Sequence, residues 1–277
     1  MTTTETLPET KDYKAQRTNI LKGKKGVILG VANKWSIAWG IANSLHDAGA
    51  ELVLTYQDRL KDRVEKLAEE LGADIPAYEC DVTNDDLLDS AFREIEMKFG
   101  GKLDFVIHSL AFAKKEELEG RYVDTSRDGY ALAQDISAFS LAAVAKRAEP
   151  MLERNGGGSL VTLTYLGGER VVPNYNVMGI AKAALECSVK YLAADLGPKN
   201  IRVNAISAGP IKTLASSAIS GISTMINQIG QVAPLRHNTE PEEVGDTALF
   251  LVSDLARGIT GEIIHVDSGF HILGAAK

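Results

Sequence analysis

The sequence is poor in cysteine and lacks both a long apolar run and an excess of basic residues. Its only two thiols, Cys80 and Cys187, are far apart and lack the paired spacing of a zinc site or a disulfide framework, so we expect both to be buried and reduced. No apolar stretch approaches the roughly 20 residues needed to cross a bilayer. The formal net charge of -7 disfavours nucleic acid and anionic membranes, because both reward a basic face. These absences predict a cytoplasmic protein with no membrane or nucleic-acid partner.

The histidines do not suggest a metal site. A protein zinc site needs three or four nitrogen, sulfur or carboxylate ligands at short, characteristic spacings. The five histidines show no such spacing, so we expect scattered structural residues and no metal; they are His46, His108, His237, His265 and His271.

The N-terminal stretch differs in composition from the rest of the chain. MTTTETLPETKDYKAQRTNI is polar, has no apolar h-region and carries acidic residues, which does not match a signal or transit peptide. We therefore expect residues 1–18 to be a polar N-terminal extension. A chain of 277 residues with 45% hydrophobic side chains can bury one full α/β core, so residues 19–277 are expected to form a single domain.

Short apolar runs then alternate with amphipathic segments. GVILG, residues 26–30, is followed by apolar residues at helical spacing from Ile37 onward. Later runs are ELVLTY, AYECDV, LDFVIHSL, SLVTLTY, IRVNAISAG and EIIHVDSG, and a long helix is expected from about Arg127 to Leu152. Strands that are apolar on both faces and joined by helical crossovers predict an α/β fold, a single-domain Rossmann-like doubly wound parallel sheet flanked by helices. Ligands of such sheets bind at the carboxyl ends of the strands.

The turn after the first expected strand is a candidate phosphate site. Gly30 follows the strand, and Ser36, Ala38 and Gly40 are small residues at the helix start. Backbone N–H groups and the helix dipole can approach a pyrophosphate there. The spacing matches neither G-x-G-x-x-G nor a Walker loop, so an ordinary turn remains the alternative interpretation of Gly30.

Polar residues follow the next two expected strands. Gln57 comes where an adenosine ribose would lie, and no basic cluster directly follows that strand, which favours NADH over NADPH. Two basic residues a little further on keep NADPH open. Asp81 and Val82 end the third strand and are candidates for contact with an adenine. The alternative role for Asp81 is to cap the helix that begins near Asn84.

The segment from Tyr165 to Lys182 holds the candidate catalytic groups. If a helix is already running at Tyr175, Lys182 lies about 10.5 Å further along the axis and only ~20° from the same face, so both side chains can point into one cleft. A lysine there can hydrogen-bond a nicotinamide ribose, and its charge, with that of oxidised nicotinamide, is expected to make Tyr175 a better proton donor. Tyr165 ends the preceding strand and can project over the same site. Alternatively, both tyrosines are packing residues and Lys182 is a solvated charge.

Five segments carry a resemblance to a known family. They are GVANKWSIAWGIA, HSLAFA, TLTYLGGERVVPNYNVMGIAKAALE, NAISAGPIKTLA and ITGEIIHVDSGFHI. Over about residues 20–272 the chain resembles the NADH-dependent enoyl-acyl-carrier-protein reductases of bacterial fatty-acid synthesis, a divergent branch of the short-chain dehydrogenase/reductase superfamily. Ordinary members of that superfamily place the lysine four residues after the tyrosine, with a serine upstream. Here six residues separate Tyr175 from Lys182, and Tyr165 stands upstream, which favours reduction of a carbon–carbon double bond over reduction of a carbonyl.

The resemblance implies that residues 19–277 are a dinucleotide-binding enoyl reductase domain that forms a homotetramer. The implied reaction transfers a hydride from NADH to the β-carbon of a trans-2-enoyl thioester linked to acyl carrier protein. By the same resemblance Tyr175 hydrogen-bonds the thioester carbonyl, Tyr165 is a second catalytic tyrosine, and Lys182 holds the cofactor. Ala113 matches a substrate-binding residue. The positions that match cofactor contacts are Gly30, Ser36, Ile37, Gln57, Asp81, Val82, Leu110, Lys182, Ile211, Lys212, Thr213, Leu214 and Ala215.

The segment 211–238 is expected to be a substrate lid. Its central part, residues 214–234, is small, apolar and uncharged and contains two glycines, as suits a pliable cover for an acyl chain. A surface helix pair packed on a neighbour is the alternative. Acyl carrier protein is acidic, yet only Lys212 and Arg236 flank this segment. The carrier-docking surface is therefore left unassigned.

Three functions remain distinguishable. They are the enoyl reductase, a 3-oxoacyl or alcohol-type short-chain reductase acting on C=O, and a non-catalytic nucleotide-binding regulator on the same scaffold. The intact pair of Tyr175 and Lys182 counts against the regulator, and the spacing of this pair favours the enoyl reductase.

Overall fold

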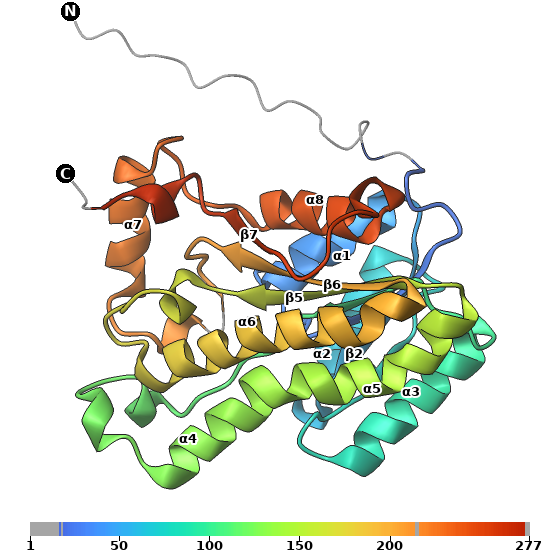
Figure 1. The fold of residues 1–277 in the computed structure, drawn as a ribbon, viewed down its shortest axis with the longest axis horizontal. Coiled ribbons are helices and arrows are strands. Elements are labelled where there is room, and N and C mark those ends of the chain that lie inside the picture. Colours follow the sequence, from blue (N-terminus) through green and yellow to red (C-terminus); the bar gives the residue numbers. More distant parts are fainter. Residues whose placement is uncertain (1–16, 18, 214–215, 275–277) are drawn as a thin grey trace, which may run out of the picture.

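The computed structural model describes residue 17, residues 19–213 and residues 216–274. This part of the chain contains one parallel sheet of 7 strands in the order β3-β2-β1-β4-β5-β6-β7, with helices on both faces (Figure 1). The chain moves from β1 towards β3 in one direction and from β4 towards β7 in the other, so β1 and β4 lie at the switch point. The predicted doubly wound fold is confirmed. The strands are β1 (Lys25–Leu29), β2 (Glu51–Tyr56), β3 (Ala77–Glu79), β4 (Phe105–His108), β5 (Gly158–Thr164), β6 (Ile201–Ala208) and β7 (Ile263–Val266).

The helices form two layers around the sheet. Helices α1, α2 and α8 share one buried core with the sheet, and α3, α5 and α6 share the other. In Figure 1, α1 and α8 lie above strands β5 and β6, whereas α5 and α6 lie below them. Among the described residues, no helix is long and apolar enough to span a membrane. The helices are α1 (Ile37–Asp47), α2 (Lys61–Leu71), α3 (Asp85–Phe99), α4 (Arg127–Gln134), α5 (Ser140–Arg154), α6 (Asn176–Leu196), α7 (Ile222–Val232) and α8 (Pro241–Val252).

The strands are continuously apolar because each face of the sheet is covered. In β1, Val27 packs into the core under α3, α5 and α6, whereas the next residue, Ile28, packs into the core under α1, α2 and α8. Successive side chains of a strand point to opposite faces, so a strand between two helix layers needs apolar residues at every position. The long helix expected from about Arg127 is present as α4 and α5, joined by a π-helical turn at Asp135–Phe139.

Helices α1 and α8 approach closely at two glycines. A Cβ on Gly40 would lie 2.6 Å from the Cβ of Pro241, and a Cβ on Gly245 would lie 2.8 Å from the carbonyl oxygen of Gly40. Side chains at these positions would force the two helices apart. We had grouped Gly40 with the candidate phosphate turn. The structure instead gives it a role in helix packing.

The two cysteines differ in exposure. Cys80 is buried, as expected, but Cys187 is exposed, so the prediction of two buried thiols is wrong for Cys187. Cys187 lies on α6. Because this helix has a hydrophobic sequence, the sequence alone does not show which of its residues face the sheet. Burial raises the pKa of the Cys80 thiol to about 12, which keeps it protonated.

One residue of the expected N-terminal extension contacts the folded domain. Arg17 is buried, and its guanidinium lies 2.6 Å from Asp246 on α8 and 3.7 Å from Asp47 at the end of α1. Residues 1–16 and 18 lie outside the described residues. The division into an extension and one domain stays a prediction.

The contact between α1 and α8 can be tested with Gly245→Ala. The added methyl group meets the carbonyl oxygen of Gly40 and the hydroxyl of Ser44, and overpacking of this kind costs about 1–3 kcal/mol. We expect a melting temperature several degrees lower by differential scanning calorimetry. Gly258→Ala is the matched control, because nothing lies within 4 Å of a Cβ there. Equal melting temperatures for the two variants would contradict the close helix contact.

Candidate active site

Most of the predicted site residues follow the carboxyl ends of strands. Because the strands are parallel, these ends lie along one edge of the sheet. In Figure 1 this edge lies on the left, beside α7. Leu214 and Ala215 lie outside the described residues. The site residues that follow strand ends are Gly30 after β1, Gln57 after β2, Asp81 and Val82 after β3, Leu110 and Ala113 after β4, Tyr165 after β5, and Ile211, Lys212 and Thr213 after β6. Ser36, Ile37, Tyr175 and Lys182 belong to helices α1 and α6 or their N-caps.

The turn between β1 and α1 lies at the switch point of the sheet. Gly30 has a φ of 100°, and a Cβ there would come within 2.7 Å of the carbonyl carbon of Ser109, just after β4. The close approach of the two strand ends therefore requires a glycine. Ser36 caps α1, accepting a hydrogen bond from the Trp39 N–H at 3.2 Å, and Ile37 is the first helical residue. The start of α1 thus offers backbone N–H groups where doubly wound sheets bind ligands.

Gln57 and Asp81 meet across two neighbouring strand ends. The Gln57 side-chain amide donates a hydrogen bond to the Asp81 carboxylate at 3.2 Å. The other carboxylate oxygen of Asp81 accepts from the Thr83 N–H at 2.9 Å. Asn84 caps α3, accepting from the Asp86 N–H at 3.0 Å, so the alternative role of Asp81 as helix cap is wrong.

The two tyrosines are in direct contact. Their rings pack edge to face with centroids 5.1 Å apart. Tyr165, Tyr175 and Ala113 belong to one small apolar cluster, whereas Ile211 packs in the core that includes α1 and α8. Gly167 makes this packing possible, since a Cβ there would lie 2.7 Å from the Tyr175 ring. The structure therefore brings the two tyrosines together with the predicted substrate residue.

Helix α6 begins one residue later than our geometric argument assumed. Tyr175 is its N-cap, with φ of -120° and ψ of -9°, and Asn176 is the first helical residue. The Tyr175 carbonyl nevertheless accepts a hydrogen bond from the Gly179 N–H at 2.9 Å. Tyr175 therefore still stands at the start of the helix that carries Lys182, although its own backbone is not helical.

Burial, with smaller contributions from Tyr165 and Glu186, lowers the acidity of Tyr175. It raises the pKa of the Tyr175 phenol above the usual range, and it raises the pKa of Tyr165 to about 12. Lys182 is not among the causes of the Tyr175 pKa shift. The predicted effect of its charge together with that of oxidised nicotinamide concerns the site with cofactor bound and stays a prediction. A neutral phenol is a good hydrogen-bond donor. None of the described residues accepts a hydrogen bond from the Tyr175 hydroxyl.

Lys182 is buried, and the alternative of a solvated helix charge is wrong. Its side-chain nitrogen donates a hydrogen bond to the Leu163 carbonyl on β5 at 2.8 Å. Burial lowers the pKa of Lys182 to about 8, while Glu186 acts to raise it. An ammonium group has three N–H donors, and within the described chain only the Leu163 carbonyl accepts from this one. Two donors therefore remain, which fits the pair of hydroxyls on a ribose.

His108 and Glu186 lie near Lys182 and escaped the sequence analysis as site residues. One ring nitrogen of His108 lies 2.9 Å from the Thr162 hydroxyl and the other 2.8 Å from that of Ser140. Burial, and then the Lys182 charge, lower the pKa of His108 to about 3. Glu186 comes four residues after Lys182, a spacing that could have revealed it. Among the described residues, no group of histidine, cysteine and acidic side chains could hold a metal ion.

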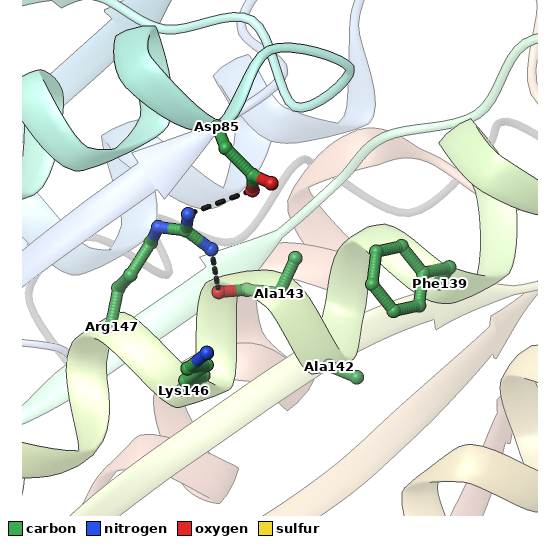
Figure 2. A pocket seen from close by; sticks show the side chains of 6 residues that line it. All are labelled: Asp85, Phe139, Ala142, Ala143, Lys146 and Arg147. Carbon is green, nitrogen blue, oxygen red and sulfur yellow. Dashed lines mark hydrogen bonds and ion pairs between the residues drawn. The ribbon is translucent and has the colours of Figure 1, made fainter.

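A surface pocket of about 330 Å³ lies elsewhere, between α3 and α5. Figure 2 shows Arg147 between Asp85 and the carbonyl of Ala143. None of the predicted site residues lines this pocket, so it is separate from the candidate active site. Its lining residues are Asp85, Phe139, Ala142, Ala143, Lys146 and Arg147.

Comparison with known proteins identifies close relatives over almost the whole chain. The family model for enoyl-(acyl carrier protein) reductase matches residues 30–271. An enoyl-[acyl-carrier-protein] reductase [NADH] of Bacillus cereus is 58% identical over 257 residues, which cover 92% of this chain and 99% of that protein. A second relative with this activity, from Rhizobium meliloti, is 56% identical over 261 residues, or 94% of each chain.

Solved structures give the same result. The crystal structure of the Bacillus cereus enoyl-acyl carrier protein reductase with NADP+ and indole naphthyridinone is 57% identical and superposes with a TM-score of 0.90, covering 93% of this chain and 100% of that chain. The reductase of Anaplasma phagocytophilum in complex with NAD is 50% identical and superposes with a TM-score of 0.89, covering 93% of this chain and 97% of that chain.

The surroundings of His108 predict that its ring stays neutral at mildly acidic pH. In an NMR titration, its Cε1–H signal, assigned by its loss in His108→Asn, should not move between about pH 8 and about pH 5. The unfolded chain binds a proton on this histidine near its ordinary pKa of 6.5, so the free energy of unfolding should fall as the pH drops below that value. Protein unfolded in urea is the control. A titration midpoint near 6.5 for His108 in the folded protein would contradict the prediction that its ring stays neutral.

Proposed function

The chain belongs to the enoyl-(acyl carrier protein) reductase family, and from that premise we propose that Tyr175 and Lys182 are its catalytic pair. The protein is an NADH-dependent oxidoreductase that saturates the carbon–carbon double bond of an enoyl group on acyl carrier protein, in fatty-acid synthesis. The carbonyl reductase and the regulator are thereby set aside. The observation that carries the proposal is the burial of Tyr175 and Lys182 at the junction of β5 and α6.

The residues along the carboxyl edge of the sheet fit a dinucleotide. Bound NADH supplies the hydride. The free N–H donors of Lys182 suit the hydroxyls of the nicotinamide ribose, and the start of α1 at Ser36 suits the pyrophosphate. Gln57 and Asp81 are joined where the adenosine is expected. NADPH stays a second candidate reductant, because one relative was crystallised with NADP+.

Tyr175 acts in this proposal as a hydrogen-bond donor to the thioester oxygen. When a hydride adds to the β-carbon, the electrons of the double bond move towards the carbonyl, and negative charge develops on its oxygen as an enolate. A positioned phenol stabilises that charge more than it stabilises the neutral substrate. Burial keeps Tyr175 protonated, so the donor is present throughout the neutral pH range. A proton then adds to the α-carbon, which completes the saturated thioester.

Tyr165 supports Tyr175 and contacts the expected lid. Its ring packs against the edge of the Tyr175 ring, and its hydroxyl donates a hydrogen bond to the sulfur of Met225 on α7 at 3.4 Å. Ile222 and Ile229 of α7 are buried, so this helix packs inward beside the tyrosines. These contacts support a role for the segment 211–238 as a cover for the acyl chain.

The remaining assignments are proposals about the setting of the enzyme. A homotetramer would cover large apolar side chains that are exposed in the single chain, among them Phe139, Tyr191 and Leu255. We also propose that the enzyme is cytoplasmic and that residues 19–277 form a single domain. In the part of the chain that the structure describes, no helix is long and apolar enough to span a membrane.

The substrate class can be tested by following NADH absorbance with three thioesters. NADH should be consumed with crotonyl and trans-2-decenoyl thioesters, because their double bond is conjugated with the carbonyl that Tyr175 is proposed to contact. Acetoacetyl thioester is the control for carbonyl reduction and should give no turnover. Turnover with acetoacetyl thioester alone would contradict the proposed function.

The two members of the catalytic pair should differ in which constant they change. Tyr175→Phe removes a hydrogen bond formed in the transition state, so kcat should fall about 10²–10³-fold with little change in NADH affinity. Lys182→Ala removes charged hydrogen bonds to the cofactor worth about 1.5–3 kcal/mol, so the NADH Kd measured by fluorescence should rise about 10- to 100-fold. Unchanged NADH affinity in the lysine variant would refute its assigned role. Circular dichroism controls for folding of both variants.

A further inference from the structure

Glu186 is a buried carboxylate one helical turn beyond Lys182. It is only 6% exposed, although it lies on a helix at the edge of the domain. Residues four apart on a helix are neighbours on the same face. The Thr164 hydroxyl, at the end of β5, donates a hydrogen bond to the Glu186 carboxylate at 2.6 Å. Glutamate is rarely this buried without a charged or hydrogen-bonded partner.

Glu186 and Lys182 bind consecutive residues of β5. Lys182 donates to the carbonyl of Leu163, and the side chain of the next residue, Thr164, donates to Glu186. Glu186 also packs against the turn that follows Tyr165, since a Cβ on Gly168 would lie 2.6 Å from its carboxylate oxygen. The carboxylate therefore joins α6, the end of β5 and the turn between the two tyrosines.

Burial disfavours the charged form of Lys182, and a nearby negative charge favours it. A buried ammonium group loses its hydration, and one carbonyl hydrogen bond replaces only part of it. We propose that Glu186 is a positioning residue for Lys182, whose buried carboxylate keeps the Lys182 ammonium charged and in register beside the cofactor site. The proposal rests on the proposed function only in taking Lys182 as the residue that holds NADH.

Other titratable groups surround this pair and must be separated from it. Burial raises the pKa of Glu186 and Glu169, after the turn, adds to that shift, whereas the hydrogen bond from Thr164, the Lys182 charge and His265 on β7 oppose it. A ring nitrogen of His265 lies 2.9 Å from the Glu169 carboxylate. His265 stacks on His271 with ring centroids 3.9 Å apart, and His271 pairs with Asp267 at 2.9 Å. His108 faces Lys182 from β4, and its lowered pKa keeps it neutral above mildly acidic pH.

The direction of the effect follows from the charges. Burial lowers the pKa of Lys182 to about 8, and Glu186 opposes that shift. Glu186→Gln keeps the size of the side chain and its acceptor for Thr164 but removes the negative charge. The pKa of Lys182 should therefore fall further, so Lys182 should lose its proton at a lower pH than in the wild type. Glu186→Asp retains the charge and is the conservative control.

The first experiment measures Lys182 directly, in the cofactor-free protein. The chain is labelled with ¹³C at the lysine ε-carbons, and the Lys182 signal is assigned by its loss in Lys182→Met. In Glu186→Gln the titration midpoint should fall by about one pH unit, the effect of losing an opposite charge one helical turn away. In Glu186→Asp it should stay nearer the wild-type value. An unchanged midpoint in folded Glu186→Gln would overturn the proposal.

If Glu186→Gln does not fold, the variant Lys182→Met tests the same coupling from the other residue. Coupling between two charges acts equally on both, so Lys182→Met should raise the pKa of the Glu186 carboxyl, measured by ¹³C NMR of labelled glutamate. The Glu186 signal is assigned by its loss in Glu186→Asp. A Glu186 midpoint that is the same with and without Lys182 would also overturn the proposal.

A second measurement separates this proposal from the proposed function. The Kd for NADH is measured by fluorescence from about pH 6.5 to about pH 9, a range in which Lys182 is expected to titrate. The pH at which affinity declines should move with the Lys182 midpoint in Glu186→Gln. If the midpoint moves and the NADH affinity does not follow, Glu186 still controls Lys182, but Lys182 does not hold the cofactor.

Discussion

The buried hydrogen bond from Lys182 to the Leu163 carbonyl ties α6 to the carboxyl end of β5, and the arrangement of the site depends on this junction. Thr164 and Glu186 make a second bond across the same two elements. The turn between β5 and α6 fits against both because Gly167 and Gly168 leave room for the Tyr175 ring and the Glu186 carboxylate. The two adjacent glycines thus allow a tyrosine, a lysine and a glutamate to share one small volume.

Burial at this junction favours the neutral form of both proposed catalytic groups, with different consequences for each. For the Tyr175 phenol it favours the neutral form, which is the form that donates a hydrogen bond to a developing oxyanion. For the Lys182 ammonium it also favours the neutral form, which would weaken its interaction with a ribose. One desolvated site therefore suits the tyrosine and disfavours the lysine. A carboxylate beside the lysine is the simplest way to satisfy both.

The fold and the edge of the sheet that carries the site could be predicted from the sequence, but several local assignments could not. Apolar runs and helical spacing report burial on average, so they gave the strand and helix order correctly. They did not show that Gly40 packs against α8 or that Cys187 is exposed. They also did not show that burial raises the pKa of Tyr175, because that burial arises only when distant elements pack together.

By itself the sequence determined the alternating strands and helices, the single parallel sheet and the spacing of Tyr175 and Lys182, because these depend on local periodicity and on covalent order. Only the tertiary structure decided which groups share a desolvated environment. The pairing of Glu186 with Thr164, the hydrogen bond between His108 and Thr162 and the contact of Tyr165 with Met225 join residues that are 22, 54 and 60 positions apart. Contacts of that kind arise when distant elements pack together, and a pKa depends on the burial they produce.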